Sequence, residues 1–236
     1  MSTRITPALG AIAMFVAALA ACGSSSHAAT TPVTVYNISA DPGDNLPAID
    51  AKHRVVLTTA VLRSTLDSVL STHATLVAAL MVRVGDGDTA PIEQVKALAS
   101  NTRALTDVVA RVYGNEAARA FAQLWEQHTQ FFIDYAQADR DHSNAAKRLA
   151  QGQLLDYQND FASFVSTATA SDASLTAVTG LLHAHVHDLT SYIDAEVAGH
   201  ETEARQILTQ AVANMHIIAK AISDAIAAQH PDTVAP

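Results

Sequence analysis

The chain lacks most of the features that catalytic and disulfide-rich proteins use. It contains one cysteine, Cys22, so no intramolecular disulfide can form. No glycine-rich phosphate loop, nucleophile elbow or pair of inward carboxylates occurs, and no serine or threonine stands beside a recognisable base. Lysine and arginine total 14 against 23 acidic residues, which argues against nucleic acid as a partner. We therefore expect a non-enzymatic protein.

The first 22 residues have the features of an export signal. Arg4 precedes a short apolar run that ends in Leu19-Ala20-Ala21-Cys22. This ending resembles the lipobox of bacterial lipoproteins. The resemblance implies that residues 1–22 are a signal peptide and that Cys22 carries the lipid, such as palmitate. The alternative is an ordinary secretory signal that is cleaved elsewhere.

The rest of the chain divides by composition into a tether, a helical domain and a tail. Residues 23–47 are rich in Ser, Ala, Thr and Pro and predict a disordered tether, whereas residues 231–236 form a short tail. Between them, apolar residues recur at alternating steps of three and four, which indicates amphipathic helices. We expect an all-α bundle of about six helices over residues 48–230. The expected ranges are 48–84, 92–113, 116–138, 143–167, 171–199 and 201–228, with Ser143 and Ser171-Asp172 as helix caps.

A lipid on Cys22 would anchor this domain to a membrane. No segment after the signal is interpreted as a membrane span, because none combines the length and the low polarity of one. The expected location is therefore the extracytoplasmic side of the cell membrane or the outer membrane, where a protein partner in the envelope is possible.

A weak internal duplication runs through the middle of the domain. Residues 124–128 align with residues 181–185, and each copy belongs to a pair of helices. Such a duplication predicts pseudo-twofold symmetry, which would bring His128 and His185 to related places. These features resemble a family of exported bacterial helical-bundle proteins of unassigned function. The motifs that carry the resemblance are Leu124 to His128, Phe161 to Phe164, and Gln229-His230-Pro231. It implies the fold and export over about residues 90–231, and it assigns no activity.

Histidines on the apolar stripes are the least ordinary feature of the sequence. His185 fills the gap between Leu182 and Leu189, so it should point into the bundle. His73 and His128 hold equivalent inward positions on two other helices, and His216 lies at the border of a fourth stripe. Neutral imidazoles that project from facing helices can hold Zn, Cu, Ni or Fe. The alternative is that each histidine is a polar core residue bonded to a neighbouring acceptor.

Two weaker candidate sites accompany this one. His183 and His187 are four residues apart and face outward, a spacing that suits two ligands of one metal ion. The alternative is a pair of solvated surface histidines, which commonly have this spacing. Trp125, Phe132, Tyr157 and Phe161 are candidates to line a pocket for a small apolar ligand, with ordinary core packing as the alternative. Three functions therefore stay open: metal binding, a structural or protein-interaction bundle, and a carrier or sensor of an apolar ligand.

Overall fold

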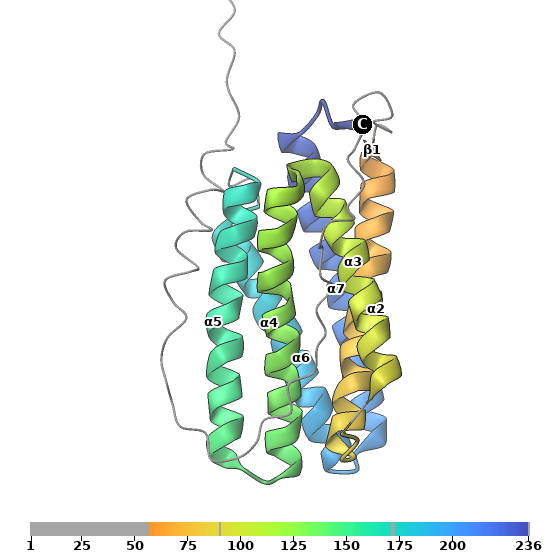
Figure 1. Ribbon diagram of the computed structural model, residues 1–236, viewed down its shortest axis with the longest axis vertical. Helices are drawn as coiled ribbons and strands as arrows, with labels where there is room; N and C mark the ends of the chain where they lie inside the picture. Colours follow the sequence, from red (N-terminus) through yellow and green to blue (C-terminus); the bar gives the residue numbers. More distant parts are fainter. Residues whose placement is uncertain (1–56, 90, 171–172, 236) are drawn as a thin grey trace, which may run out of the picture.

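The computed structural model describes residues 57–89, 91–170 and 173–235. The predicted signal peptide, the lipidation site at Cys22 and the predicted tether lie outside these residues. In the described part, six long helices run alternately up and down in one elongated bundle (Figure 1). The predicted all-α bundle of about six helices is thus confirmed. The helices are α2 (Thr59–Gly85), α3 (Ile92–Tyr113), α4 (Asn115–Arg140), α5 (Asn144–Ala168), α6 (Leu175–Val197) and α7 (Glu201–Gln229).

Three of the six helices begin at a residue whose side chain caps the first turn. The Ser143 side chain accepts a hydrogen bond from the backbone N–H of Ala146, as predicted for the start of α5. Gly114, with φ of +88°, lies alone between α3 and α4, where a left-handed conformation favours glycine. The predicted Ser171-Asp172 cap is wrong, because Ser174 caps α6 through the N–H of Ala177. Residues 171–172 themselves lie outside the described range.

A pair of two-residue strands joins the two ends of the described chain. Strand β1 (Leu57–Thr58) pairs in parallel with β2 (Val234–Ala235), so that Leu57 is opposite Val234. The first helix therefore begins at Thr59 rather than near residue 48, because residues 57 and 58 are extended and the Thr58 side chain caps α2. Val234 is buried, so part of the predicted tail takes part in packing.

Two of the described helices, α2 and α7, are long and apolar enough to cross a membrane. This finding corrects the expectation that no segment after the signal could do so. In the bundle the two helices pack along each other, and Arg63 on α2 pairs with Asp224 on α7. Core helices of soluble proteins meet the same criterion of length and hydropathy.

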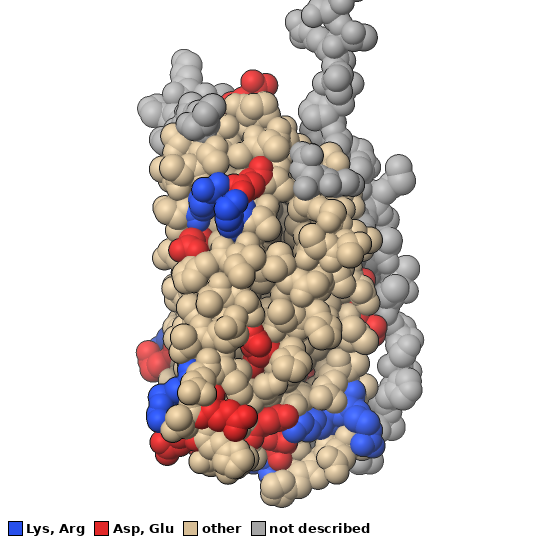
Figure 2. All heavy atoms as spheres, turned by 180° about the vertical axis from the view of Figure 1, so that it is seen from behind, with Lys and Arg blue, Asp and Glu red and all other residues tan. Residues whose placement is uncertain are grey.

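Charged side chains are unevenly distributed over the face seen in Figure 2. They gather towards the end that carries the turn between α6 and α7, and few lie over the middle of this face. Ion pairs of that end include Lys147 with Asp139 and Asp194, at 2.5 and 2.8 Å, and Arg205 with Glu201.

The interior contains two apolar clusters with a polar layer between them. One cluster includes Leu70 of α2, Trp125 of α4 and Leu182 of α6. The other includes Val77, Phe132 and Leu189 from the same three helices. These three helices contact one another. Each of them carries a buried histidine between these two residues, the one of the first cluster and the one of the second. The fold thereby brings three histidines to one level of the core.

Candidate metal centre

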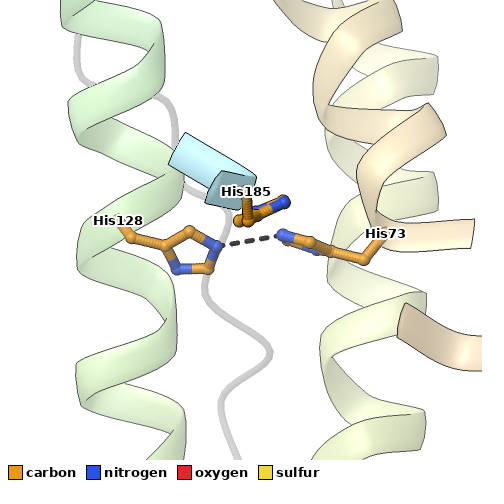
Figure 3. A group of neighbouring side chains, drawn as sticks. All are labelled: His73, His128 and His185. Atoms are coloured by element: carbon orange, nitrogen blue, oxygen red, sulfur yellow. Dashed lines mark hydrogen bonds between the residues drawn. The ribbon is translucent and has the colours of Figure 1, made fainter. Parts of the chain in front are cut away.

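Helices α2, α4 and α6 each place one imidazole in the polar layer. His73, His128 and His185 are 0%, 1% and 5% exposed, and their rings converge from three sides (Figure 3). Each lies three or four residues from apolar residues on both sides, so the helical repeat that buries those neighbours also buries the histidine. We call these three residues the tri-histidine cluster.

The cluster has a spacing suited to a single metal ion. One ring nitrogen from each histidine lies within 4.8 Å of the other two. The Nε2 atoms of His73 and His128 are 2.9 Å apart, and the ring centroids of His73 and His185 are 6.3 Å apart. Three metal–nitrogen bonds of about 2.0 Å in a plane need nitrogens about 3.5 Å apart, so shifts on the order of 1 Å would complete a site. The three histidines can therefore hold a metal.

Hydrogen bonding sets the tautomer of His128. Its Nδ1 contacts the backbone carbonyl oxygen of Trp125, three residues earlier on α4. A carbonyl oxygen only accepts, so Nδ1 carries the hydrogen and donates it, and Nε2 of the neutral ring has a free lone pair. His73 Nε2–H then donates to that lone pair. A backbone carbonyl on the second ring nitrogen is the arrangement that commonly orients a metal-ligating histidine.

Burial keeps all three imidazoles neutral at pH 7. Desolvation, together with the positive charge of a protonated His185, lowers the pKa of His128 from an ordinary 6.5 to about 3, although the hydrogen bond to the Trp125 carbonyl acts in the opposite direction. Desolvation likewise lowers the pKa of His185 to about 4. The pKa of His73 is lowered by burial and by its two histidine neighbours, an effect that the Asn101 side chain partly opposes. Neutral imidazole is the form that binds a metal.

Two buried amides belong to the same layer and were not predicted from the sequence. Asn101 of α3 lies between Leu98 and Leu105, which belong to different apolar clusters, and its Nδ2 donates to the carbonyl of Val69. Its Oδ1 and the Nδ1 of His73 are both buried without a hydrogen bond of good geometry. Gln158 of α5 is also buried, and its Oε1 lacks a partner. Each amide occupies a position where the helical spacing of apolar residues predicts another apolar residue, and this was the available signal for both.

The other predicted metal ligands lie elsewhere. His216 is exposed on α7, and its Nδ1 lies 2.5 Å from the Asp67 carboxylate of α2. His183 and His187 are exposed on α6. Asp194, seven residues after His187 on the same helix, accepts hydrogen bonds from Tyr135 and Lys147. None of these residues joins the tri-histidine cluster.

The aromatic residues pack beside the cluster and border a small cavity. The ring of Trp125 lies 4.6 Å from those of His73 and His128, and Tyr157 stacks on His128 at 4.7 Å. Trp125 and Phe161 line an apolar cavity of about 60 Å³, whereas Phe132 and Tyr157 do not. A cavity of about 150 Å³ admits benzene, so this one is too small for an aromatic ligand.

No protein-family model, curated protein or solved structure matches the chain. Its class is therefore defined by its own fold and geometry. The protein is an all-helical bundle in which three buried histidines from three helices lie close enough together to hold a metal ion.

Proposed function

We propose that the protein is a non-enzymatic, lipid-anchored bundle on the extracytoplasmic side of a membrane that binds a transition-metal ion through His73, His128 and His185. The observation that carries the proposal is the convergence of three buried neutral imidazoles, with their ligand atoms within 4.8 Å of one another. Zn, Cu, Ni and Fe all suit imidazole ligands. The Trp125 carbonyl supports the proposal further. It accepts the hydrogen on Nδ1 of His128 and so fixes the tautomer whose Nε2 lone pair faces the centre of the cluster.

Metal content is the direct test of this function. The purified chain, incubated with Zn, Cu, Ni or Fe salts and desalted, is expected to retain one equivalent of one metal. The variant in which His73, His128 and His185 are all alanine is expected to retain none, because three ligands are lost. A variant with His183 and His187 changed to alanine controls for surface histidines. Elemental analysis measures all three, and equal metal in the wild type and the first variant would contradict the proposal.

A structural or protein-interaction bundle is the competing function, and one observation favours it. His128 has partners for both ring nitrogens without any metal, which is how a purely structural core histidine is satisfied. His185 separates the two functions, because its Nδ1 is buried without a partner. Such an unpaired group is costly to keep unless it has a ligand to bind.

The metal-free His185→Leu variant is therefore expected to be more stable than the wild type, by about 1–2 kcal/mol at pH 7. The leucine replaces an unpaired polar group and packs beside Leu182 and Leu189. Urea unfolding followed by circular dichroism measures the change, with the exposed His183→Leu as the matched control on the same helix. A clear loss of stability in His185→Leu would favour the structural role.

The lipid anchor has a separate test. The chain is expected to fractionate with membranes and to be released by detergent, whereas Cys22→Ser is expected to move to the soluble fraction because it lacks the acyl chains. Ser26→Ala serves as the control for a change in the same segment. Retention of Cys22→Ser on membranes would instead point to α2, α7 or a membrane-bound partner as the means of attachment.

A further inference from the structure

The ligand set of the tri-histidine cluster carries no charge. Among the described residues, the group that could hold a metal contains three neutral histidines and no aspartate, glutamate or cysteine. The acidic residues of α2 and α6 are engaged elsewhere, as Asp67 pairs with His216 and Asp188 accepts from Asn214. An ion bound at the cluster would therefore bring its whole charge into the core.

The surroundings of the cluster make that charge costly. The rings of Trp125, Tyr157 and Phe132 pack against the histidines, and none of the three is more than 5% exposed. The cost of transferring an ion from water into such a medium rises with the square of its charge, so a divalent ion costs about four times as much as a monovalent ion of the same size. Without a carboxylate ligand, the cluster can offset this cost only through its neutral nitrogens.

The number of ligands also disfavours a divalent ion at the cluster. Zn²⁺ takes a fourth ligand, and Cu²⁺ and Ni²⁺ favour tetragonal sites with four or more. A fourth ligand here would be a water molecule or hydroxide from outside the cluster, and the cavity beside the cluster is apolar and is lined by none of the three histidines. Cu(I) is monovalent, has a filled d shell and is satisfied by three nitrogen donors.

We propose that the tri-histidine cluster selects monovalent copper, Cu(I), over divalent transition-metal ions, because it offers three uncharged nitrogens in an aromatic core and no acidic ligand. This inference rests on the proposed metal-binding function and names its ion.

The test compares the affinities of one protein for two ions. The full chain carries Cys22→Ser, so that its one thiol cannot bind copper. Cu(I), kept reduced with ascorbate under nitrogen, and Zn(II) are each titrated against a chromogenic chelator of known affinity. Trp125, the chain's one tryptophan, lies against two of the histidines, so quenching of its fluorescence by copper reports binding at this place. His128→Ala and the exposed His183→Ala are the loss and control variants, and circular dichroism verifies that each is folded.

We expect one Cu(I) per chain, bound at least about 100-fold more tightly than Zn(II), with the difference abolished in His128→Ala and kept in His183→Ala. Zn(II) bound as tightly as Cu(I) would overturn the inference and leave the proposed metal-binding function standing. Binding of neither ion would overturn the inference, and elemental analysis that finds no Ni or Fe either would overturn the metal-binding function as well. Cu(I) binding that is unchanged in His128→Ala would place the copper elsewhere and would also overturn the inference.

A charge substitution tests the reason for the selectivity. His185→Asp supplies the missing negative charge and replaces the ring nitrogen of His185 with a carboxylate oxygen as the ligand atom. If the folded variant is obtained, the ratio of Cu(I) to Zn(II) affinity is expected to fall by about 10-fold or more, because a carboxylate compensates a divalent ion better than an imidazole does. An unchanged ratio would show that charge is not what the cluster discriminates. If the variant does not fold, the comparison of the two ions in the wild-type sequence still decides the inference.

Discussion

Acidification of the metal-free protein from pH 7 to pH 5 is expected to lower its free energy of unfolding by roughly 4 kcal/mol through His128 and His185, and further in the same direction through His73. The cause is the tri-histidine cluster. In the folded protein, burial lowers the pKa of His128 to about 3 and that of His185 to about 4, and it lowers the pKa of His73 well below 6.5. In the unfolded chain all three regain ordinary pKa values near 6.5.

The sign follows from where the protons bind. Below pH 6.5 the unfolded chain takes up protons that the folded chain excludes, so the stability present above pH 6.5 is lost as the pH falls towards 4. His128 and His185 each contribute roughly 2 kcal/mol of this loss by pH 5, since one pH unit corresponds to about 1.4 kcal/mol, and His73 adds to it. The loss is a large part of the whole stability of many domains, about 5–15 kcal/mol. The metal-free bundle should therefore be markedly less stable at pH 5 than at pH 7.

Urea unfolding at pH 7, 6 and 5 in the presence of a chelator measures this dependence. The variant with both His128→Leu and His185→Leu should lose most of it, because only His73 remains of the three histidines. Stability that is equal at pH 7 and pH 5 in the wild type would show that the cluster is hydrated or protonated in the folded protein. A bound metal should shift the acid transition to lower pH, because protons and metal compete for the same nitrogens.

The Phe132→Ala substitution is expected to cost about 3–5 kcal/mol of stability. Phe132 is fully buried, and its ring lies 6.0 Å from those of His128 and His185 in edge-to-face arrangements. Its removal leaves a cavity between two imidazoles and removes the surface that holds both rings in their orientations. We therefore expect a lower affinity for metal as well as a lower stability, because a site whose supporting residues are lost is less well preorganised.

Phe131→Ala is the matched control for this substitution. Phe131 is the preceding residue of the same helix and is only partly buried, so its loss should cost less and should leave metal affinity nearly unchanged. Urea unfolding gives the two stabilities, and chelator competition gives the two affinities. Equal effects of the two substitutions would indicate that Phe132 contributes only general hydrophobic burial.

The helices and the inward direction of the three histidines could be predicted from the sequence, whereas their meeting point could not. Apolar spacing fixes which side of a helix is buried, and it placed His73, His128 and His185 inside. It does not fix how far one helix slides along another, which decides whether three inward residues share one level. His216 shows the limit of the pattern, because it lies one residue from buried Met215 and a rotation of about 100° turns it to the solvent.

The features that were not predicted correctly from the sequence have similar causes. Asn101 and Gln158 were not predicted, because amides are usually exposed and their position on an apolar stripe is a weak signal by itself. The cap of α6 was assigned to Ser171-Asp172 because both residue types favour capping, whereas the actual cap, Ser174, is equally suitable by composition. The pairing of β1 with β2 joins residues from opposite ends of the described part of the chain, which no local pattern reveals.

The contact between α2 and α7 also has a kinetic consequence. Arg63 and Asp224, which pair across these two helices, are 161 positions apart in the chain. Helices α3 to α6 can form contacts with their sequence neighbours as they are synthesised, but α2 finds its most extensive packing surface only when the last helix has been made. A nascent chain that ends before α7 leaves an apolar side of α2 uncovered, and such surfaces are where incomplete chains associate with chaperones or with each other.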